Sequence, residues 1–221
     1  MDAVTVRQLG IIPYQAAYDR MLQFTQARTA QTVDEIWLVE HPPVFTLGKA
    51  ADPANILNAG RIPVVRTDRG GDVTYHGRGQ AVVYLLIDLR RRFNRLWVQA
   101  FVAGLEVAVL QVLAQHQIQG ERHPGAPGIY IPAHQGAKIA ALGLKVNHKG
   151  CIYHGLALNV DMDLAPFSRI NPCGYPGLAA TDMKTEGADC QVKDIQSELV
   201  QALAHHIGFT IKGGQPWPEP S

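Results

Sequence analysis

The chain has 221 residues, of which 47% are hydrophobic and 18% charged, and its formal net charge is +1. This length suits one well-buried domain, and the near-neutral charge argues against a dedicated nucleic-acid binder, which usually carries a strong basic excess. We expect neither a secretory signal in the first ten residues nor an apolar run approaching the roughly 20 residues needed to span a membrane.

The first half of the chain mixes short strands with helices. Clusters of apolar and β-branched residues predict strands over residues 4–9, 35–40, 44–47, 63–67 and 81–87. Pro13 suits the first turn of a helix, and residues 14, 17, 18, 21 and 22 fall on one face of that helix. Asp52 and Pro53 form an N-cap and N1 pair for a short helix through Leu57.

The second half contains the longest predicted elements. An apolar stripe predicts a helix over residues 95–117, and two apolar runs, 138–146 and 151–160, predict strands joined by a turn at 147–150. A last helix is predicted over 192–206, with Gly208 just past its end. Strands and helices mix without a strict βαβ rhythm. We therefore expect a single α/β (α+β) domain with a mixed sheet over residues 1–211, followed by a disordered tail over 212–221.

A glycine-rich insert, RGGDVTYHGRGQ at residues 69–80, separates two of the predicted strands. Its glycines permit a tight backbone path that a ligand can approach closely. The insert is not a P-loop, because no Gly-Lys-Ser/Thr follows, and it lacks the third glycine of a dinucleotide fingerprint. An elaborate strand connection would also explain it. Its length and its polar side chains favour a binding loop instead.

Cys173 is the candidate nucleophile, because it lies on a Pro-Cys-Gly loop after Asn171. Proline holds the residue before it in an extended conformation, and glycine permits close backbone approach, so the loop presents one thiol in a fixed place. Most free cysteines are small buried hydrophobes, and packing suffices to explain Cys151 and Cys190. Three cysteines, an odd number, favour a reducing compartment over a disulfide framework, so we expect a cytoplasmic location.

Lys138 begins an apolar run, KIAALGLKV. Read as a strand, it alternates with Ala140, Leu142 and Leu144, so its ammonium starts a face that is otherwise apolar. A free thiol has a reference pKa of about 8.5, and a nearby positive charge favours the thiolate. Lys138 is the candidate source of that charge for Cys173, and a surface lysine at a strand end is the alternative.

Other chemistries lack their motifs. The histidines are scattered, no HExxH or paired CxxC spacing occurs, and Cys151-x-x-His154 is a lone half-site, so we expect no metal site. The GxSxG motif of many serine hydrolases is absent. The basic run 90–92 with Arg95 is typical of a solvated face, and a docking patch for an acidic protein is the second interpretation.

Four stretches together resemble the lipoyl(octanoyl) transferases of lipoate biosynthesis: RGGDVTYHG-x-GQ, AKIAALGLKV, HGLALNV and FSRINPCGY. The resemblance implies the single α/β domain with a mixed sheet that this family shares with biotin protein ligases and lipoate-protein ligases. It places the acyl-thioester cysteine at Cys173 and the lysine that favours its thiolate at Lys138. One departure is Arg78, where the family commonly has proline. The substrate contacts that the resemblance implies are Arg69, Gly70, Gly71, Asp72, Val73, Thr74, Tyr75, His76, Ala141, Leu142, Gly143, Gly155, Leu156 and Ala157.

The resemblance also implies a reaction and its partners. An octanoyl group would move from octanoyl-acyl carrier protein to Cys173, and then to a lysine of a lipoyl domain, without a cofactor. The implied acceptors are the lipoyl domains of 2-oxoacid dehydrogenase E2 subunits and the glycine cleavage H protein. Such an enzyme needs no nucleic acid and no membrane, and we expect a monomer.

Two alternatives stay open at this point. An ATP-dependent lipoate or biotin ligase on the same fold would form an acyl-adenylate and would not need Cys173. A non-enzymatic module that binds acyl carrier or lipoyl domains would never acylate the thiol.

Overall fold

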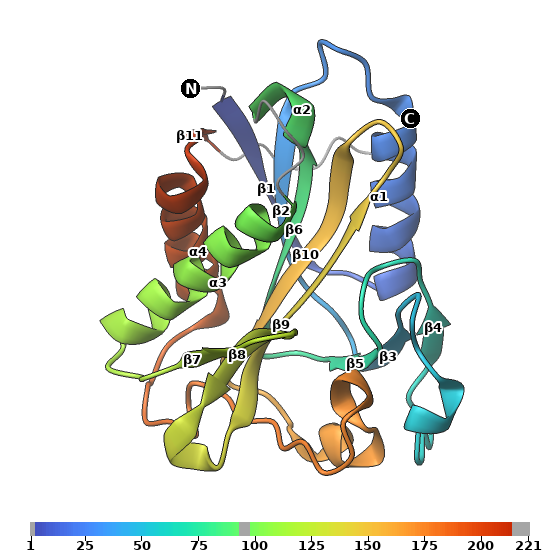
Figure 1. The fold of residues 1–221 in the computed structure, drawn as a ribbon, viewed down its shortest axis with the longest axis vertical. Coiled ribbons are helices and arrows are strands. Elements are labelled where there is room, and N and C mark those ends of the chain that lie inside the picture. The colour runs from blue at the N-terminus through green and yellow to red at the C-terminus, as the bar shows by residue number, and fades with distance from the viewer. Residues whose placement is uncertain (1–2, 93–97, 214–221) are drawn as a thin grey trace.

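The computed structural model describes residues 3–92 and 98–213 and shows a central sheet with helices on both of its faces (Figure 1). The helices are α1 (Tyr14–Ala27), α2 (Leu89–Arg92), α3 (Val98–Gln115) and α4 (Val192–Ile207). The strands are β1 (Ala3–Ile11), β2 (Asp34–Glu40), β3 (Val44–Leu47), β4 (Val64–Arg66), β5 (Val73–His76), β6 (Gln80–Asp88), β7 (Glu121–His123), β8 (Ala126–Ile131), β9 (Ala137–Val146), β10 (Cys151–Asn159) and β11 (Thr210–Lys212). Short 3-10 helices are η1 (Pro53–Asn55), η2 (Pro132–His134), η3 (Ala165–Arg169) and η4 (Pro172–Gly174).

Two mixed sheets are formed by these strands. The large sheet has the order β11-β1-β2-β6-β10-β9-β8-β7, and the small sheet has the order β4-β3-β5. In the large sheet β1 is parallel to both β11 and β2, and the other neighbours are antiparallel. The predicted mixed sheet is therefore confirmed.

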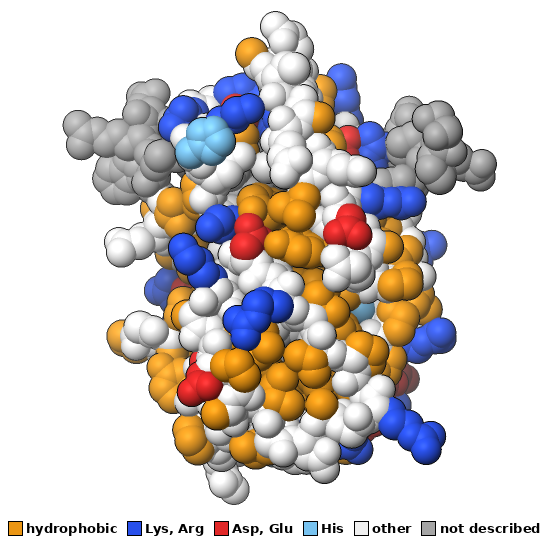
Figure 2. Space-filling view, turned by 90° about the vertical axis from the view of Figure 1, so that its right-hand side faces the viewer, with side chains coloured by type: hydrophobic (Ala, Val, Ile, Leu, Met, Phe, Trp, Pro, Cys, Tyr) orange, Lys and Arg blue, Asp and Glu red, His pale blue; other side chains and the backbone are white. Residues whose placement is uncertain are grey.

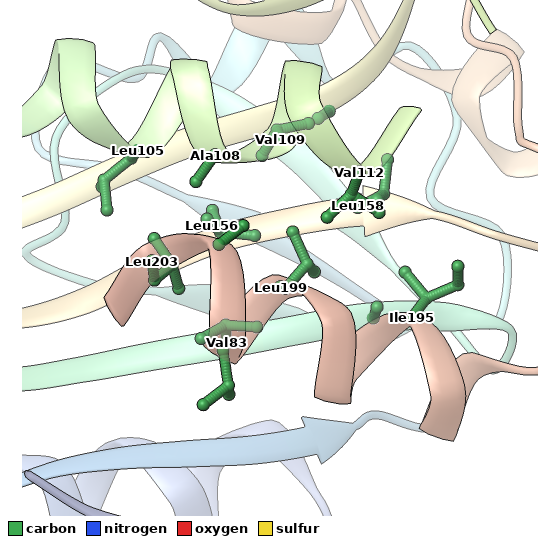
Figure 3. Packing of buried hydrophobic residues seen from close by; sticks show 14 of the residues in the cluster. Val83, Leu105, Ala108, Val109, Val112, Leu156, Leu158, Ile195, Leu199 and Leu203 are labelled. Carbon is green, nitrogen blue, oxygen red and sulfur yellow. The ribbon is translucent and has the colours of Figure 1, made fainter. Parts of the chain in front are cut away.

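β6 lies in the middle of the large sheet and is buried on both faces, as a strand covered by helices on each side must be. Val83 and Leu85 face the core under α3 and α4, whereas Val82 and Tyr84 face α1. Figure 3 shows the first of these cores, with leucines of β10 lying between the side chains of α3 and α4. The face toward α1 is the one that carries the site.

α3 is long and apolar enough, by length and composition alone, to span a membrane. The expectation that no apolar run approaches that length is therefore wrong for this helix. Its apolar side chains, among them Phe101, Leu105, Val109 and Val112, are buried against α4 and the large sheet. This packing places the apolar face of α3 in the core of the described fold.

The structure confirms two residues that the sequence predicts at helix ends, one N-cap and one C-terminal glycine. The Asp52 side chain accepts a hydrogen bond of 2.9 Å from the backbone N–H of Ala54, although the helix that it caps is only the single turn η1. Gly208 ends α4 in the left-handed conformation with φ of 82°, where glycine carries no steric penalty.

The sequence analysis does not predict four of the strands. β7, β8 and β11 lie outside the predicted strands, and β5 runs through the insert that the sequence predicts to be a binding loop. β5 and β11 have only four and three residues and pair with strands distant in the sequence, so local patterns carry little signal for them. Lys212, assigned to the disordered tail, is the last residue of β11. Residues 214–221 of that tail and residues 95–97 of the predicted long helix lie outside the described residues.

Figure 2 shows the face of the molecule on the side of α1 and β4. Hydrophobic side chains gather on the middle and lower part of this face, and lysine and arginine side chains are spread around them. Two of the exposed large hydrophobic residues, Leu57 and Val64, come from the region of η1 and β4.

Candidate active site

A β-bulge in β9 turns Lys138 away from the face that simple alternation gives it. Ile129 of β8 pairs with Ala140, and the next residue, Tyr130, pairs with Lys138, so Ile139 is an extra residue in β9. Ile139 and Ala140 both lie in the core under α3 and α4. Lys138 therefore shares the opposite face with Tyr130, and the predicted common face of Lys138 and Ala140 is wrong. Bulges commonly re-aim a side chain beside an active site.

The Lys138 side chain is buried, with 7% of its surface exposed, and ends beside Cys173. Its Nζ lies 3.1 Å from the Cys173 Sγ, donates to the carbonyl of Pro127 at 3.0 Å, and lies 5.0 Å from the centre of the Tyr130 ring. Burial alone disfavours the ammonium, but the interactions with Cys173 and Tyr130 outweigh it and raise the pKa of Lys138 above its ordinary value. Lys138 is therefore a cation at neutral pH.

The loop around Cys173 is held in an uncommon backbone conformation. Cys173 has φ of 57° and Gly174 has φ of 78°, so two successive residues are left-handed. The Gly174 N–H donates to the Asn171 carbonyl at 2.9 Å, which closes the turn. A left-handed residue other than glycine costs about 1 kcal/mol or more and persists only where its surroundings enforce it. The thiol direction is thus set by the loop, as the Pro-Cys-Gly sequence predicts.

Two other segments hold this loop in place. The Asn171 N–H donates to the Asn55 carbonyl at 2.8 Å, and the Asn171 side-chain amide donates to the Asn55 Oδ1 at 3.2 Å. Asn55 in turn donates to the Asp72 Oδ2 at 2.9 Å. A Cβ added to Gly174 would lie 2.9 Å from the same oxygen, so the close approach requires glycine. Asp72 therefore connects the glycine-rich insert to the cysteine loop.

Arg69 organises the start of the insert from a buried position. Its guanidinium donates to the Thr46 hydroxyl at 3.1 and 2.8 Å, to the Thr46 carbonyl at 2.7 Å, and to the Gly70 carbonyl at 3.0 Å. These bonds use most of its donors on the backbone and side chain of β3 and on the insert itself. Arg69 places the insert beside the sheet and adds a positive charge to this region.

A cavity extends from Cys173 across the large sheet. Its sheet side is built of small residues, because Gly143 pairs with Gly155 and Ala141 pairs with Ala157 across β9 and β10. Absent or short side chains leave room above these strands for a ligand, while Ala140 of β9 and Leu158 of β10 lie in the core on the opposite face. The cavity is therefore a narrow, largely apolar slot that opens at the thiol.

The end of the slot over β6 and α1 is lined by polar side chains that the sequence analysis did not identify, namely Tyr14, Tyr84 and His154. His154 has φ of 62°, and its ring stacks on Tyr18 of α1, although Ile152, two residues earlier in β10, lies in the core under α3. The Tyr14 hydroxyl and the His154 Nδ1 are buried without a hydrogen bond of normal geometry. The sequence places Tyr14 on one face of a helix, and this position gives no sign of a cavity.

Most of the predicted substrate contacts line this slot, and three of the predicted site residues do not. Gly70 and Lys138 line a second cavity that also reaches Cys173. The Tyr75 ring contacts Phe45 and Phe167, with ring centroids 5.6 and 5.4 Å away, and belongs to a separate core. The predicted residues that line the slot are Arg69, Gly71, Asp72, Val73, Thr74, His76, Ala141, Leu142, Gly143, Gly155, Leu156, Ala157 and Cys173.

The titratable groups around the slot are held in defined charge states. Burial lowers the pKa of His41 to about 4 and of His76 to about 3, so both rings are neutral at neutral pH. Burial favours protonation of Asp68, but hydrogen bonds from His154 and Tyr153 outweigh it and lower its pKa to about 2. Within residues 3–92 and 98–213 no three His, Cys, Asp or Glu side chains are grouped so that they could hold a metal ion.

The basic run at α2 contacts nearby loops of the same chain. The Arg90 guanidinium donates to the His148 carbonyl at 2.9 Å, and Arg91 donates to Asp34 at 2.8 Å and to the Thr32 carbonyl at 2.7 Å. Arg95 lies outside the described residues. Docking of an acidic partner at this run stays a prediction.

A buried lysine–cysteine pair at the mouth of an apolar slot, on this fold, fits an enzyme that transfers acyl groups. The chain belongs to the family described as Lipoyl protein ligase A/B catalytic domain, which it matches over residues 12–204. The resemblance drawn from its motifs is thereby confirmed.

Two curated relatives carry the name Octanoyltransferase. The protein from Herminiimonas arsenicoxydans is 55% identical over 206 residues, which cover 91% of this chain and 95% of that protein. The protein from Burkholderia pseudomallei (strain K96243) is 54% identical over 217 residues, which cover 96% and 95% of the two chains. Among solved structures, the bi-partite lipoate protein ligase from Thermoplasma acidophilum matches with a TM-score of 0.77 at 14% identity, covering 99% of this chain and 89% of that one. That likeness confirms the expected fold.

Proposed function

We propose that this protein is an octanoyltransferase that takes an octanoyl group from octanoyl-acyl carrier protein and delivers it to a lysine of a lipoyl domain. The observation that carries the proposal is the 3.1 Å approach of the Lys138 Nζ to the Cys173 Sγ at the mouth of the slot. The full-length similarity to proteins named Octanoyltransferase supports the same acyl group. An acyl-adenylate ligase would not need Cys173.

The first half-reaction forms an acyl-enzyme. The Cys173 thiolate, favoured by the Lys138 ammonium, attacks the thioester carbonyl of the donor, and the carbon–sulfur bond to the carrier breaks. The carrier thiolate that leaves takes a proton, for which the adjacent ammonium of Lys138 is the nearest source. One thioester replaces another, so the step is close to even in free energy and needs no nucleotide.

The second half-reaction depends on how acylation changes the environment of Lys138. The thiolate charge contributes to raising the lysine pKa, and acylation makes the sulfur neutral. With that charge gone, burial lowers the pKa of Lys138 and favours its neutral amine. Lys138, which gave its proton to the carrier thiolate in the first half-reaction, therefore stays neutral and accepts a proton from the incoming amine as that amine attacks the thioester. Thioester to amide runs downhill, which makes the transfer effectively one-way.

The slot accounts for the acyl group that is carried. The paired small residues Gly143–Gly155 and Ala141–Ala157 form a floor on which an extended aliphatic chain can lie. The polar ends of Tyr14 and His154 close the slot over α1, so a chain long enough to reach them would bury them without partners. We infer that this polar end limits the length of the acyl chain.

The second cavity suits the two macromolecular substrates, which must reach the thiol in turn. It opens beside Gly70, Tyr130 and Lys138 and also reaches Cys173. The acceptors that we propose are the lipoyl domains of 2-oxoacid dehydrogenase E2 subunits and the glycine cleavage H protein. We propose that the enzyme works as a cytoplasmic monomer, and its three free cysteines fit a reducing compartment.

Intact-mass measurement tests the proposal directly. Mixing the protein with octanoyl-acyl carrier protein, without nucleotide, should add one octanoyl group to the enzyme, and adding a lipoyl domain should then move that group to the acceptor. Cys173→Ala should block both steps, because a methyl group forms no thioester, while Cys151→Ser and Cys190→Ser should be acylated normally. Acceptor modification that requires ATP and free octanoate would identify a ligase instead.

A further inference from the structure

The peptide bond between Pro127 and Gly128 lies between two charged side chains. Its carbonyl accepts a hydrogen bond of 3.0 Å from the Lys138 Nζ. Its N–H, on the Gly128 side of the same planar group, donates to the Glu106 Oε1 at 3.0 Å. Because the peptide unit is rigid, the position of the carbonyl follows from the position of the N–H. The carboxylate of Glu106 is thereby coupled to the ammonium of Lys138 without touching it.

Glu106 is an unusual residue for its place in the molecule. It lies on α3 and is 8% exposed, while the other buried residues of that helix are apolar. A buried carboxylate is costly unless charged or polar partners satisfy it. Its partners are the Gly128 N–H and, more loosely, the guanidinium of Arg122 at 3.8 Å. The main contact of the Glu106 carboxylate is therefore the Pro127–Gly128 peptide, which also holds Lys138.

Gly128 leaves the space through which the lysine reaches the thiol. It has φ of 134°, a conformation that favours glycine. A Cβ at this position would lie 2.4 Å from the Lys138 Cε and 3.0 Å from its Nζ. The side chain of Lys138 thus passes directly over the bare backbone of Gly128, and it can do so only while that backbone stays in place.

We propose that Glu106 is a positioning residue for the acyl-transfer site, acting through the Pro127–Gly128 peptide to hold the Lys138 ammonium beside Cys173. The proposal rests on the proposed function, because it assigns Glu106 a part in that reaction. A lysine has a long flexible stem and three rotatable donors, so a single contact with sulfur would not fix it. The carboxylate on the N–H also polarises the peptide and makes its carbonyl a better acceptor.

The test measures the thiol itself and does not require acyl transfer. Alkylation of Cys173 by iodoacetamide is followed by mass spectrometry from pH 5.5 to pH 9.5, in a background where Cys151 and Cys190 are serine. Glu106→Ala should move the midpoint of the alkylation profile upward by about one pH unit, which slows the reaction about tenfold at neutral pH. In octanoyl transfer it should lower kcat and leave the KM for the donor nearly unchanged.

Further variants show whether Glu106 acts by positioning Lys138, by supporting the fold, or through its negative charge. Glu106→Gln keeps an oxygen that accepts from the Gly128 N–H, so its alkylation profile should stay close to that of the parent. Gly128→Ala should shift the profile in the same direction as Glu106→Ala, because its Cβ would lie 2.4 Å from the Lys138 Cε and 2.6 Å from the Ala140 carbonyl oxygen and so displaces both the lysine and the paired strand. Glu198→Ala removes a partly exposed carboxylate from α4 and serves as the matched control, with thermal unfolding of every variant as a check on the fold.

The alkylation profiles of these variants distinguish the role of Glu106 from the role of Lys138. An upward shift in Glu106→Ala, with Glu106→Gln close to the parent, supports the proposal. If Lys138→Ala shifts the profile and Glu106→Ala does not, the role of Glu106 is overturned and the proposed function stands. Equal shifts in Glu106→Gln and Glu106→Ala would also overturn it, because the charge and not the held peptide would then be responsible. If Lys138→Ala itself causes no shift, both the lysine–thiol pair and the role of Glu106 are refuted.

Discussion

Gly143 and Gly155 face each other across β9 and β10, so the sheet beside the thiol has two adjacent positions with no side chain. Both glycines line the slot, and neither has a left-handed backbone. They are needed for space and not for conformation. The surroundings differ, since Gly155 lies against the backbone of β6 and Gly143 lies against the insert.

Substitution of these glycines should separate stability from substrate binding. A Cβ on Gly155 would lie 1.9 Å from the Val83 carbonyl oxygen, so Gly155→Ala forces β6 and β10 apart and should lower the free energy of unfolding by about 3 kcal/mol. A Cβ on Gly143 would lie 3.1 Å from the Gly70 carbonyl oxygen, so Gly143→Ala should fold and raise the KM for the acyl donor. Urea unfolding and steady-state kinetics measure the two effects.

Gly104 supplies the control for those variants. It lies within α3, where the nearest heavy atom to an added Cβ would be 3.7 Å away. Gly104→Ala should therefore raise stability by about 0.5–1 kcal/mol through helix propensity alone. Equal stability losses in Gly104→Ala and Gly155→Ala would refute the steric argument.

Lys138 should have different importance in the two half-reactions. Lys138→Ala removes the positive partner of the thiol, so alkylation of Cys173 should slow at neutral pH and recover as the pH rises. Lys138→Arg keeps the charge but does not give up a proton, so it should restore acyl-enzyme formation better than transfer to the amine. Rapid-quench measurement of each half-reaction distinguishes them. Parental rates in both variants would reduce Lys138 to a structural residue.

Two buried tyrosines at the end of the slot should respond in opposite directions to loss of the hydroxyl. The Tyr14 hydroxyl makes no hydrogen bond of normal geometry, so Tyr14→Phe should raise stability by about 1 kcal/mol. The Tyr84 hydroxyl lies 2.7 Å from the His41 Nε2, so Tyr84→Phe leaves a buried ring nitrogen unpaired and should cost about 1–3 kcal/mol. Urea midpoints compared at pH 7.5 test the pair, and changes of the same sign would contradict it.

The buried histidines make the fold sensitive to acid. In the unfolded chain a histidine takes up its proton near pH 6.5, whereas the folded pKa is about 4 for His41 and about 3 for His76. Between these values the unfolded state binds more protons, so stability should fall as the pH decreases from about 6.5 to about 4. The slope should be about 1.4 kcal/mol per pH unit for each histidine. Urea midpoints measured from pH 7.5 to pH 4 give this slope.

Substitutions test whether His41 and His76 cause this dependence of stability on pH. The double variant His41→Gln, His76→Gln should be less stable at pH 7.5, because it disturbs a packed region, yet its stability should change less between pH 6.5 and pH 4. His148→Gln alters an exposed histidine in the turn after β9 and should keep the parental slope. An unchanged slope in the double variant would show that other groups cause the acid sensitivity.

The sequence could predict the parts of the site that depend on neighbouring residues in the chain. Cys173 is identified by the proline and glycine that flank it, and the small residues of β9 and β10 are visible as a pattern. The direction of Lys138 could not be predicted, because the bulge that turns it depends on pairing with β8, and β8 itself was not expected. His154 was missed because a left-handed residue inside a strand contradicts the alternation on which strand prediction depends.

The hydrogen bond between Asn171 and Asn55 joins positions 116 residues apart. Contacts at such separation form only after a long stretch of chain has been ordered, so they come late and are sensitive to any failure upstream. During synthesis Lys138 leaves the ribosome before the thiol does, and neither has its partner until the cysteine loop docks on η1. On the proposed mechanism, a newly made or partly unfolded copy has not yet brought Lys138 beside Cys173, so only the fully folded protein should be loaded with an acyl group.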